Sequence, residues 1–296
     1  MIALTGATGF VGSSLAAQLK VKQIPFRCLV RKNSKNLKRI QNISAECVEV
    51  EFSSTESIAS ALEGCELVIH VMGLINGSES MLEQVNIEFT RNLTAASVQR
   101  KIQKFIFISS VAATMRHGSY GITKYKAEEI VKQSGIPYLI FRPAWIFGPG
   151  DTTNSAMMIK TLKLSPFIPL LGGGTFKIQP VYVDDTVSLI LQGIHFSKIN
   201  SAYMVAGAEQ VSLKMILETF SKHLKLKRIF IPIPLKPLQA VLRMYLKINP
   251  GTKLPAKQIL ELDKHESFDI SETRRDFKFE PIKFEEGAKR MFSCAG

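Results

Sequence analysis

The feature that most constrains this chain is a glycine-spaced loop near its start. Gly6, Gly9 and Gly12 form the pattern G-x-x-G-x-x-G directly after an apolar run at 2–5 and directly before a helical pattern. In that context Gly6 permits a tight turn, Gly9 lets the backbone approach a pyrophosphate, and Gly12 lets the helix pack closely on the strand. The helix start also offers N–H groups to an anion. The loop therefore predicts dinucleotide binding, with an ordinary glycine-rich turn as the alternative. The predicted phosphate-binding residues are Gly6, Ala7, Thr8, Gly9, Phe10, Val11 and Gly12.

The first half of the chain alternates strand-like and helix-like segments, as βαβ units and a parallel sheet require. Short β-rich runs lie at 2–5, 26–30, 46–51, 67–71, 105–109 and 138–141. Helical patterns lie between them at 11–19, 55–62, 81–100 and 120–133. Ser80 and Glu83 form a capping box before the third of these patterns. Later segments predict a strand at 179–183, a helix at 185–194, and a helix capped by Ser212 that runs to His223.

The predicted fold class is α/β: a Rossmann-type doubly wound parallel sheet with a smaller C-terminal α/β substrate lobe. We place the NADP-binding core at 1–150 and expect 178–198 to return to it. The substrate lobe then comprises 151–177 and 199–296.

Length and composition set limits on the class of protein. The chain has 296 residues, of which 46% are apolar, enough for one large domain or one domain with a small lobe. The four cysteines form no C-x-x-C pair and the histidines show no metal-ligand spacing, so neither a metal nor a disulfide framework is expected. A strand-like run from Ile2 leaves no room for a signal peptide, and no apolar run reaches the length of a membrane span. We expect a cytoplasmic protein, one that can also be peripheral at a membrane.

The end of the second predicted strand bears on the choice of dinucleotide. NAD sites usually carry Asp or Glu there to bind the ribose 2′-hydroxyl, whereas this strand ends Cys28-Leu29-Val30-Arg31-Lys32. The planar guanidinium of Arg31 suits a 2′-phosphate, and Lys32 is near enough in sequence to assist. Alternatively, Arg31 belongs to a general basic surface. We predict NADP(H) in preference to NAD(H).

A second pattern predicts catalytic chemistry. Tyr120 and Lys124 form Y-x-x-x-K, and the spacing of four puts both on one face of a helix. A nearby ammonium should lower the pKa of Tyr120, which would exchange a proton with a substrate oxygen during hydride transfer. Ser110 follows the fifth predicted strand, where an open α/β sheet places its ligands. Because Y-x-x-x-K also arises by chance, the catalytic set Ser110, Tyr120 and Lys124 is a hypothesis.

The formal net charge of +13 is concentrated late in the chain. Between Lys198 and Lys257 there are eleven Lys or Arg and two Glu. Within that stretch, 229–248 mixes large apolar residues with basic ones, which suits a helix on an anionic membrane surface. A solvated basic face is the alternative. No zinc finger, RNP signature or basic-region heptad is present, so nucleic acid is not an expected partner. We predict that 198–257 contacts an anionic membrane or a protein complex.

Taken with further motifs, the sequence resembles the short-chain dehydrogenase/reductase superfamily in its extended or atypical branch, the NAD-dependent epimerase/dehydratase family. The resemblance spans nearly the whole chain. Beyond the glycine loop and Y-x-x-x-K, it rests on 67–70 (LVIH), 86–92 (NIEFTRN), 105–110, Arg142-Pro143, 147–151 (FGPGD) and 181–185 (VYVDD).

The resemblance implies further cofactor contacts. It implies that Glu51 and Phe52 border the adenine, that Val71, Met72 and Gly73 line the cofactor cleft, and that the backbone of Pro143 faces the nicotinamide. It assigns the C-terminal lobe to a small-molecule substrate and implies a monomer or homodimer.

One departure from the family bears on function. Ser110 and Tyr120 are only ten positions apart, fewer than is usual in sugar-nucleotide epimerases of the family. The short segment resembles the atypical branch that includes the nucleotide-binding accessory subunit of respiratory complex I, in which some members bind NADPH without turnover. Two hypotheses follow: an NADP-dependent oxidoreductase, epimerase or dehydratase, and a non-catalytic NADPH-binding protein that acts in assembly at a membrane complex.

Overall fold

The protein is represented by a computed structural model that describes residues 1–31, 34, 36–43, 45–116, 118–248 and 266–293. The predicted cofactor residue Lys32 lies outside the described residues, as does the end of the basic stretch that runs to Lys257. The chain divides into two compact units. Unit 1 comprises Met1–Ile146, Val183–Val205 and Asp269–Glu280, and unit 2 comprises Phe147–Tyr182, Ala206–Phe268 and Pro281–Gly296.

Unit 1 is built on a seven-stranded parallel sheet in the order β11-β6-β5-β4-β1-β2-β3. The chain reverses its direction of travel across the sheet between β3 and β4, which makes the sheet doubly wound and confirms the predicted fold class. Its strands are β1 (Ile2–Thr5), β2 (Phe26–Arg31), β3 (Glu46–Val50), β4 (Leu67–His70), β5 (Lys104–Ile108), β6 (Tyr138–Pro143) and β11 (Ser201–Val205).

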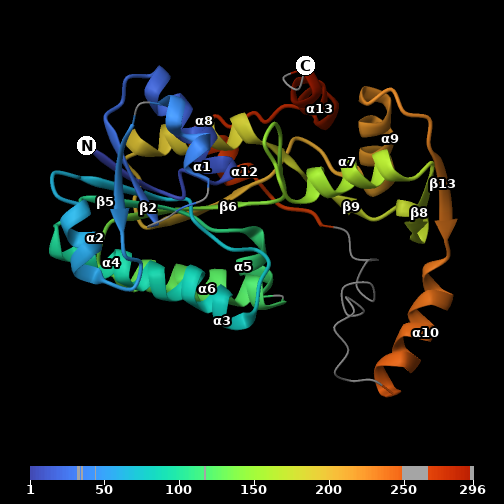
Figure 1. Ribbon diagram of the computed structural model, residues 1–296, viewed down its shortest axis with the longest axis horizontal. Coiled ribbons are helices and arrows are strands. Elements are labelled where there is room, and N and C mark those ends of the chain that lie inside the picture. The colour runs from blue at the N-terminus through green and yellow to red at the C-terminus, as the bar shows by residue number, and fades with distance from the viewer. Residues whose placement is uncertain (32–33, 35, 44, 117, 249–265, 294–296) are drawn as a thin grey trace. The chain divides into compact units, whose positions relative to one another are not determined.

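Helices cover both faces of this sheet (Figure 1). One face carries α1 (Phe10–Val21) and α8 (Val183–His195), and the other carries α2 (Thr55–Ala61), α4 (Phe89–Gln99) and α6 (Gly118–Gln133). Shorter helical elements of the unit are η1 (Leu37–Arg39), η2 (Gln41–Ile43), α3 (Glu79–Glu83), η3 (Gln84–Glu88), α5 (Val111–Met115) and α12 (Ser271–Phe277).

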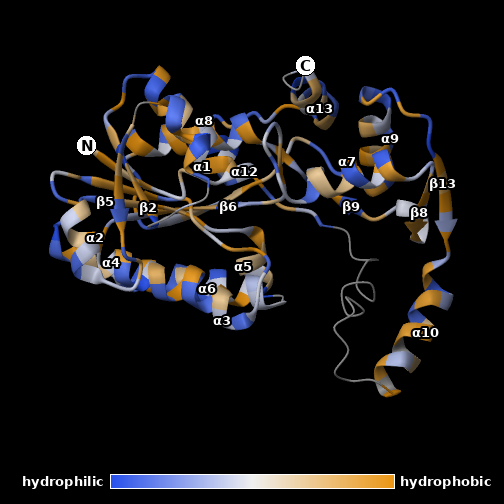
Figure 2. Cartoon of the chain, viewed as in Figure 1, coloured by the Kyte–Doolittle hydropathy of each residue, from blue (hydrophilic) through white to orange (hydrophobic). Residues whose placement is uncertain are grey.

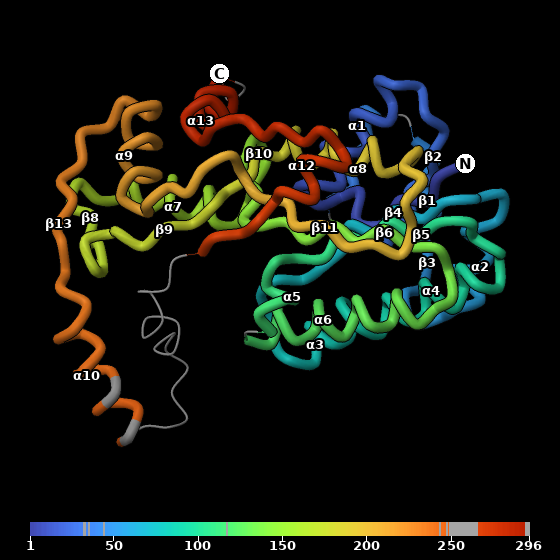
Figure 3. The backbone as a smooth tube through the Cα atoms, turned by 180° about the vertical axis from the view of Figure 1, so that it is seen from behind, coloured from blue at the N-terminus to red at the C-terminus, as the bar shows by residue number. Residues whose placement is uncertain are grey.

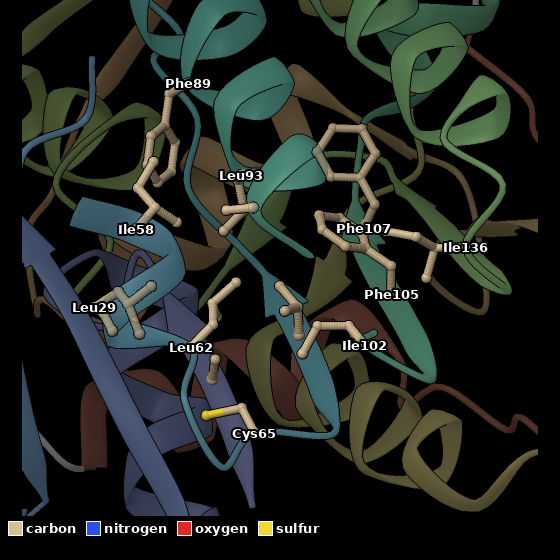
Figure 4. Packing of buried hydrophobic residues seen from close by; sticks show 14 of the residues in the cluster. Leu29, Ile58, Leu62, Cys65, Phe89, Leu93, Ile102, Phe105, Phe107 and Ile136 are labelled. Carbon is tan, nitrogen blue, oxygen red and sulfur yellow. The ribbon is translucent and has the colours of Figure 1, made fainter. Parts of the chain in front are cut away.

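The core under α2, α4 and α6 follows from the period of each element. Figure 4 shows Leu29, Phe105 and Phe107 of the sheet directed toward Ile58 and Leu93 of the helices. Phe105 and Phe107 are two residues apart on β5, and Phe89 and Leu93 are four apart on α4, so each of these elements buries one face. The dry, close-packed layer holds the strand ends in register, and the strand ends carry the candidate site.

Two segments lie in unit 1 although we predicted them in the smaller lobe. Residues 201–205 form β11, which pairs in parallel with β6 from Ser201↔Leu139 to Val205↔Pro143. Helix α12 packs on β11, and the Thr273 hydroxyl donates to the Met204 carbonyl over 2.6 Å. An edge strand leaves unpaired backbone groups, and a distant segment of sufficient β-propensity can satisfy them.

Of the two predicted helix N-caps, one is confirmed and the other is wrong. Ser212 caps α9 (Leu213–His223) as predicted, accepting a bond from the Met215 amide. The predicted capping box at Ser80 is wrong, because α3 begins two residues earlier and Ser78 accepts from the Met81 amide over 3.3 Å. Ser78 and Ser80 could each cap a helix at this point, and the tertiary contacts determine which of them does.

Unit 2 consists of short ribbons and helices. Its ribbons pair β13 in parallel with β8, and β12 antiparallel with β9. The strand β7 (Ile146–Phe147) has one residue in each unit. The other elements of unit 2 are α7 (Asn154–Leu164), β8 (Phe167–Leu171), η4 (Gly172–Gly174), β9 (Lys177–Ile178), β10 (Val181–Tyr182), β12 (Val211–Ser212), α9 (Leu213–His223), β13 (Ile229–Ile233), α10 (Leu235–Ile248) and α13 (Phe284–Ser293). Among the described residues, no helix combines the length and the apolar character needed to cross a bilayer.

Candidate active site

The glycine loop adopts the turn that its spacing predicts. Gly6 has φ +76°, in the region that favours glycine, and its carbonyl accepts a hydrogen bond from the Gly9 amide over 2.9 Å. A Cβ on Gly12 would lie 2.0 Å from the Gly6 oxygen, so only glycine lets α1 start this close to β1. Gly9 precedes the helix and has no capping side chain, which leaves the first-turn amides directed at an approaching anion.

The phosphate loop lies against the loop that follows β4. A Cβ on Gly6 would lie 2.7 Å from the Met72 backbone nitrogen, so the two loops are in backbone contact. The next residue, Gly73, lies beside the Y-x-x-x-K helix, because a Cβ there would be 3.5 Å from Lys124 Nζ. Val71, Met72 and Gly73 thus connect the predicted phosphate loop to the predicted catalytic residues.

A pocket of about 990 Å³ opens at the carboxyl ends of β2 and β3. It brings together Arg31, Glu51 and Phe52, which the sequence analysis assigned to the cofactor on separate grounds. Asn92 fixes this wall by donating from Nδ2 to the Phe52 carbonyl over 3.0 Å. The sequence analysis missed Arg91, which is a second cation on the pocket wall. The sequence does contain a pattern that could have predicted Arg91, because Glu88, Arg91 and Asn92 recur at helical spacing on one face of the helix.

Ser110 and Tyr120 are brought together by the short segment between them. That segment folds into α5, whose N-cap is Ser110, and a close contact at Gly121 packs α6 against α5. The Ser110 hydroxyl lies close enough to the Tyr120 phenol to influence its pKa. Burial raises the pKa of Tyr120, and the Ser110 hydroxyl opposes that rise. The predicted lowering of the Tyr120 pKa by Lys124 is therefore wrong, because burial raises this pKa and keeps the phenol protonated.

Lys124 is buried beneath the site. Its Nζ donates to the Ile108 carbonyl over 2.8 Å and lies 4.2 Å from the centroid of the Phe107 ring. Burial lowers the pKa of Lys124 to about 7, and the Glu128 carboxylate limits that fall. The ammonium is thus directed at the end of β5 rather than at Tyr120.

Asn86 joins the cleft loop to the catalytic helix. Its side chain accepts from the Leu74 amide over 2.7 Å and donates to the Leu74 carbonyl over 2.9 Å. It also donates to the Thr123 hydroxyl over 3.0 Å, and that hydroxyl donates to the Tyr120 carbonyl. Asn86 sits in the π-helical turn η3, a geometry that is frequent at functional sites. The π turn widens the helix so that this side chain reaches both partners.

Arg142 and Pro143 end β6 at the same edge of the sheet. The Arg142 guanidinium holds the buried Glu128 carboxylate of α6 in a two-pronged pair, with Nε–Oε1 at 2.9 Å and Nη2–Oε2 at 2.6 Å. This pair fastens the strand end to the catalytic helix, and it places the buried Pro143 next to the Ser110 strand end. Arg142 is a positioning residue here rather than a surface cation.

His70 is buried at the end of β4 between two threonines. Its Nδ1 lies 2.6 Å from Thr5 Oγ1, and its Nε2 lies 3.0 Å from Thr90 Oγ1. Thr90 uses its proton to donate to the Asn86 carbonyl, so Nε2 of His70 must be the donor and Nδ1 the acceptor. Burial lowers the pKa of His70 well below its ordinary value, and the Lys124 charge adds to this. His70 is therefore a neutral structural link.

Unit 2 has a pocket of its own, of about 590 Å³, between α7 and α13. Asp151 of the FGPGD motif lines it, and its carboxylate accepts from the Thr153 amide and hydroxyl and from the Ser155 amide. These bonds explain the motif as the start of α7. Within the described residues no cluster of three potential metal ligands occurs.

Comparison with known proteins places this geometry in context. The chain matches the NAD(P)H-binding family over residues 6–165. A ceramide reductase of Caulobacter vibrioides is 28% identical over 64% of this chain, but the match spans only 60% of that reductase. A UDP-glucose 4-epimerase of Vibrio cholerae is 26% identical over 79% of each chain. Subunit 9 of the NADH dehydrogenase 1 alpha subcomplex of Arabidopsis thaliana is 26% identical over 88% of this chain and 67% of its own.

Solved structures agree with the fold. The crystal structure of gox2253 superposes with a TM-score of 0.85 at 23% identity, covering 99% of this chain and 97% of that one. UDP-glucuronic acid 4-epimerase of Bacillus cereus, crystallised in complex with NAD, superposes with a TM-score of 0.79 at 19% identity over the same shares. These similarities show the doubly wound fold.

Proposed function

Because the chain belongs to the NAD(P)H-binding family, whose relatives include epimerases and dehydrogenases, we propose that it is an NADP-dependent oxidoreductase or epimerase acting on a hydroxyl or carbonyl group. The observation that carries the proposal is that Ser110, Tyr120 and the buried Lys124 come together beside the loop that touches the glycine turn.

The residues present fit a dinucleotide. A Cβ at Gly6 or Gly12 would clash with backbone atoms, so the glycines keep the loop in its tight turn, and the β2–β3 pocket has room for the adenosine end. When bound, the nicotinamide supplies or accepts the hydride. Tyr120, protonated because burial raises its pKa, donates a proton to a carbonyl oxygen, and Ser110 donates a hydrogen bond that orients this oxygen. Lys124, with Asn86 nearby, is positioned to bind a ribose hydroxyl.

The test of catalysis is Tyr120→Phe, which removes the proton donor and keeps the ring. Turnover should fall by about 10²- to 10⁴-fold, while NADPH affinity stays within about threefold. NADPH consumption is measured over a panel of ketones, alcohols and nucleotide sugars, including ceramide precursors because the Caulobacter relative is named for that lipid. Tyr125→Phe, on the same helix, is the matched control. Undiminished turnover in Tyr120→Phe would contradict the assignment.

Preference for NADPH over NADH is argued from charge. Arg31 and Arg91 line the β2–β3 pocket together with Glu49, Glu51 and Glu88, and a 2′-phosphate would pair with the two guanidinium groups. Arg31→Asp should weaken NADPH binding by about 10- to 100-fold, the worth of one charge-assisted bond, and NADH binding far less. Isothermal titration calorimetry measures both, with Arg39→Asp in η1 as the control. Equal losses for the two dinucleotides would refute the preference.

A second candidate function is a non-catalytic NADPH-binding protein at a membrane complex. It is favoured by the similarity to a complex I subunit over 88% of this chain. Under this alternative, the wild-type protein binds NADPH tightly yet turns over no member of the panel. Tyr120→Phe then alters neither binding nor stability appreciably.

A further inference from the structure

Helix α10 carries an apolar stripe that faces solvent. Val241, Met244 and Ile248 are 61%, 63% and 71% exposed, and Tyr245 is 38% exposed. Their spacing of three, one and three residues puts them on one side of the helix. Isolated exposed apolar residues are ordinary, but four in a continuous stripe mark an interaction surface. We call this set the α10 stripe.

Leu235 at the start of α10 lies near Gly172 of η4, and beyond that α10 has no extensive contact with another described element. Figures 1 and 3 show it extending past the end of β13, and the described helices and ribbons of unit 2 pack elsewhere. Figure 2 shows hydrophobic residues over much of its length. The ribbon that leads into it is also apolar, with Ile229, Ile231 and Phe167 about half exposed. An isolated helix of this length is only marginally stable in water, because most helical stability comes from packing of the apolar side. We therefore expect a partner to cover the α10 stripe.

The charge around the helix identifies the chemistry of that partner. The sequence from 219 to 260 contains no Asp or Glu, and Lys236 of α10 is exposed. Positions 236, 243 and 247 are all Lys or Arg, at spacings of seven and four that recur on one side of a helix. By the same helical spacing, positions 241, 244, 245 and 248 lie on a different side of α10 from these basic positions. A basic side next to an apolar side is the pattern of a helix that lies in the interface of an anionic bilayer.

A second copy of this chain is a poorer occupant. Two α10 stripes packed together would bring two acid-free basic segments close to each other, and like charges repel at that distance. An anionic lipid surface instead offers apolar chains to the stripe and opposite charge to the flanking lysines and arginines.

We propose that α10 docks the protein on an anionic lipid bilayer, with the α10 stripe inserted at the level of the acyl chains. The surface lies in unit 2, whereas every predicted cofactor and catalytic residue lies in unit 1. The proposal therefore does not depend on the proposed function, and each can fail alone.

The test is flotation of the full-length protein with vesicles. Protein is mixed at low salt with vesicles of phosphatidylcholine containing phosphatidylglycerol, or with phosphatidylcholine alone. Wild type should float with the anionic vesicles, and its binding should weaken as salt is raised. Val241→Glu/Ile248→Glu should lower the affinity on the order of 100-fold, since two buried side chains are lost and two repelled charges are added.

The matched control is Val21→Glu/Val98→Glu, which makes the same change of charge at two exposed valines of unit 1. Its affinity should fall by less than about threefold. Equal losses in the two double variants would mean that net charge alone drives binding, and would overturn the proposal. So would failure of the wild type to float at low salt, or a dimer that only the α10 double variant dissociates. NADPH titration of the same samples reports on the proposed function separately.

Insertion itself is measured with Tyr245→Trp, a mild change that keeps the helix apolar. Anionic vesicles should shift its emission to the blue, and brominated lipids should quench it. Val98→Trp is the control, and Trp145, the one natural tryptophan, contributes equally to both. An emission that vesicles leave unchanged in Tyr245→Trp would overturn insertion.

Discussion

At the scale of single residues, burial sets the protonation of the site. Lys124 and Tyr120 are neighbours on α6, yet burial moves their pKa values in opposite directions, Lys124 down to about 7 and Tyr120 upward. Near neutral pH, much of the population then has an uncharged Lys124 beside a protonated phenol. An electronegative ribose at Gly73 would favour the ammonium again, so we expect cofactor binding to raise the Lys124 pKa.

The buried His70 should make the free energy of unfolding depend on pH. Its pKa is lowered in the folded protein, so below the ordinary histidine value the unfolded chain binds a proton that the folded chain does not. Stability from this source is lost as pH falls, at about 1.4 kcal/mol per pH unit below about pH 6.5. Urea unfolding of the wild type between pH 7 and 5.5 should show this slope, and His70→Gln should lack it. Parallel pH profiles for the two proteins would contradict a neutral buried His70.

At the scale of elements, the site depends on how closely helix starts approach strand ends. The glycine turn fixes α1 against β1, the π turn η3 directs Asn86 to two loops, and the Arg142–Glu128 pair joins β6 to α6. Each contact fixes a helix relative to a strand end or a loop. Small shifts of a helix would therefore alter both cofactor binding and the Ser110–Tyr120 contact.

The glycine loop allows stability and binding to be separated. Gly12→Ala places a methyl group 2.0 Å from the Gly6 oxygen and should lower the free energy of unfolding by about 1–3 kcal/mol or more. Gly9→Ala meets only the Gly6 oxygen, at 3.2 Å, so it should destabilise the fold less than Gly12→Ala, but it should bind NADPH more weakly because Gly9 is where the backbone is expected to approach the pyrophosphate. Denaturant titration and calorimetry measure the two effects. A stable Gly12→Ala protein would contradict the close approach of α1.

At the scale of the whole molecule, the two units divide the properties of the chain. Every predicted cofactor residue within the described part of the chain lies in unit 1, whereas the α10 stripe and much of the acid-free basic stretch lie in unit 2. A protein of net charge +13 will also bind anions weakly without specificity, so salt dependence must accompany each binding measurement.

Cofactor binding should stabilise the protein by mass action. At an NADPH concentration about 100 times the Kd, the gain is about 2.7 kcal/mol, or about 5–10 °C in Tm for a domain of this size. Scanning calorimetry should show a smaller shift with the same concentration of NADH. Arg31→Asp should remove the difference between the two. Identical shifts for NADPH and NADH in the wild type would contradict the role of Arg31.

Much of unit 1 could be predicted from local sequence. The strands 2–5 and 26–31, the helix after Gly9 and the helix that carries Tyr120 and Lys124 were all anticipated, because period-2 and period-3.6 patterns and glycine spacing are local signals. The glycine loop and the Y-x-x-x-K pair were likewise visible as sequence motifs.

What the tertiary structure alone decided are the relations between distant segments. It determined that β11 completes the sheet, that Arg91 joins Arg31 on one pocket wall, and that Lys124 is directed at the Ile108 carbonyl, so that burial rather than a neighbouring ammonium governs the Tyr120 pKa. The physical reason is that strand pairing, burial and electrostatic environment depend on atoms contributed by residues far apart in the chain, whereas sequence patterns report only on the geometry of neighbours.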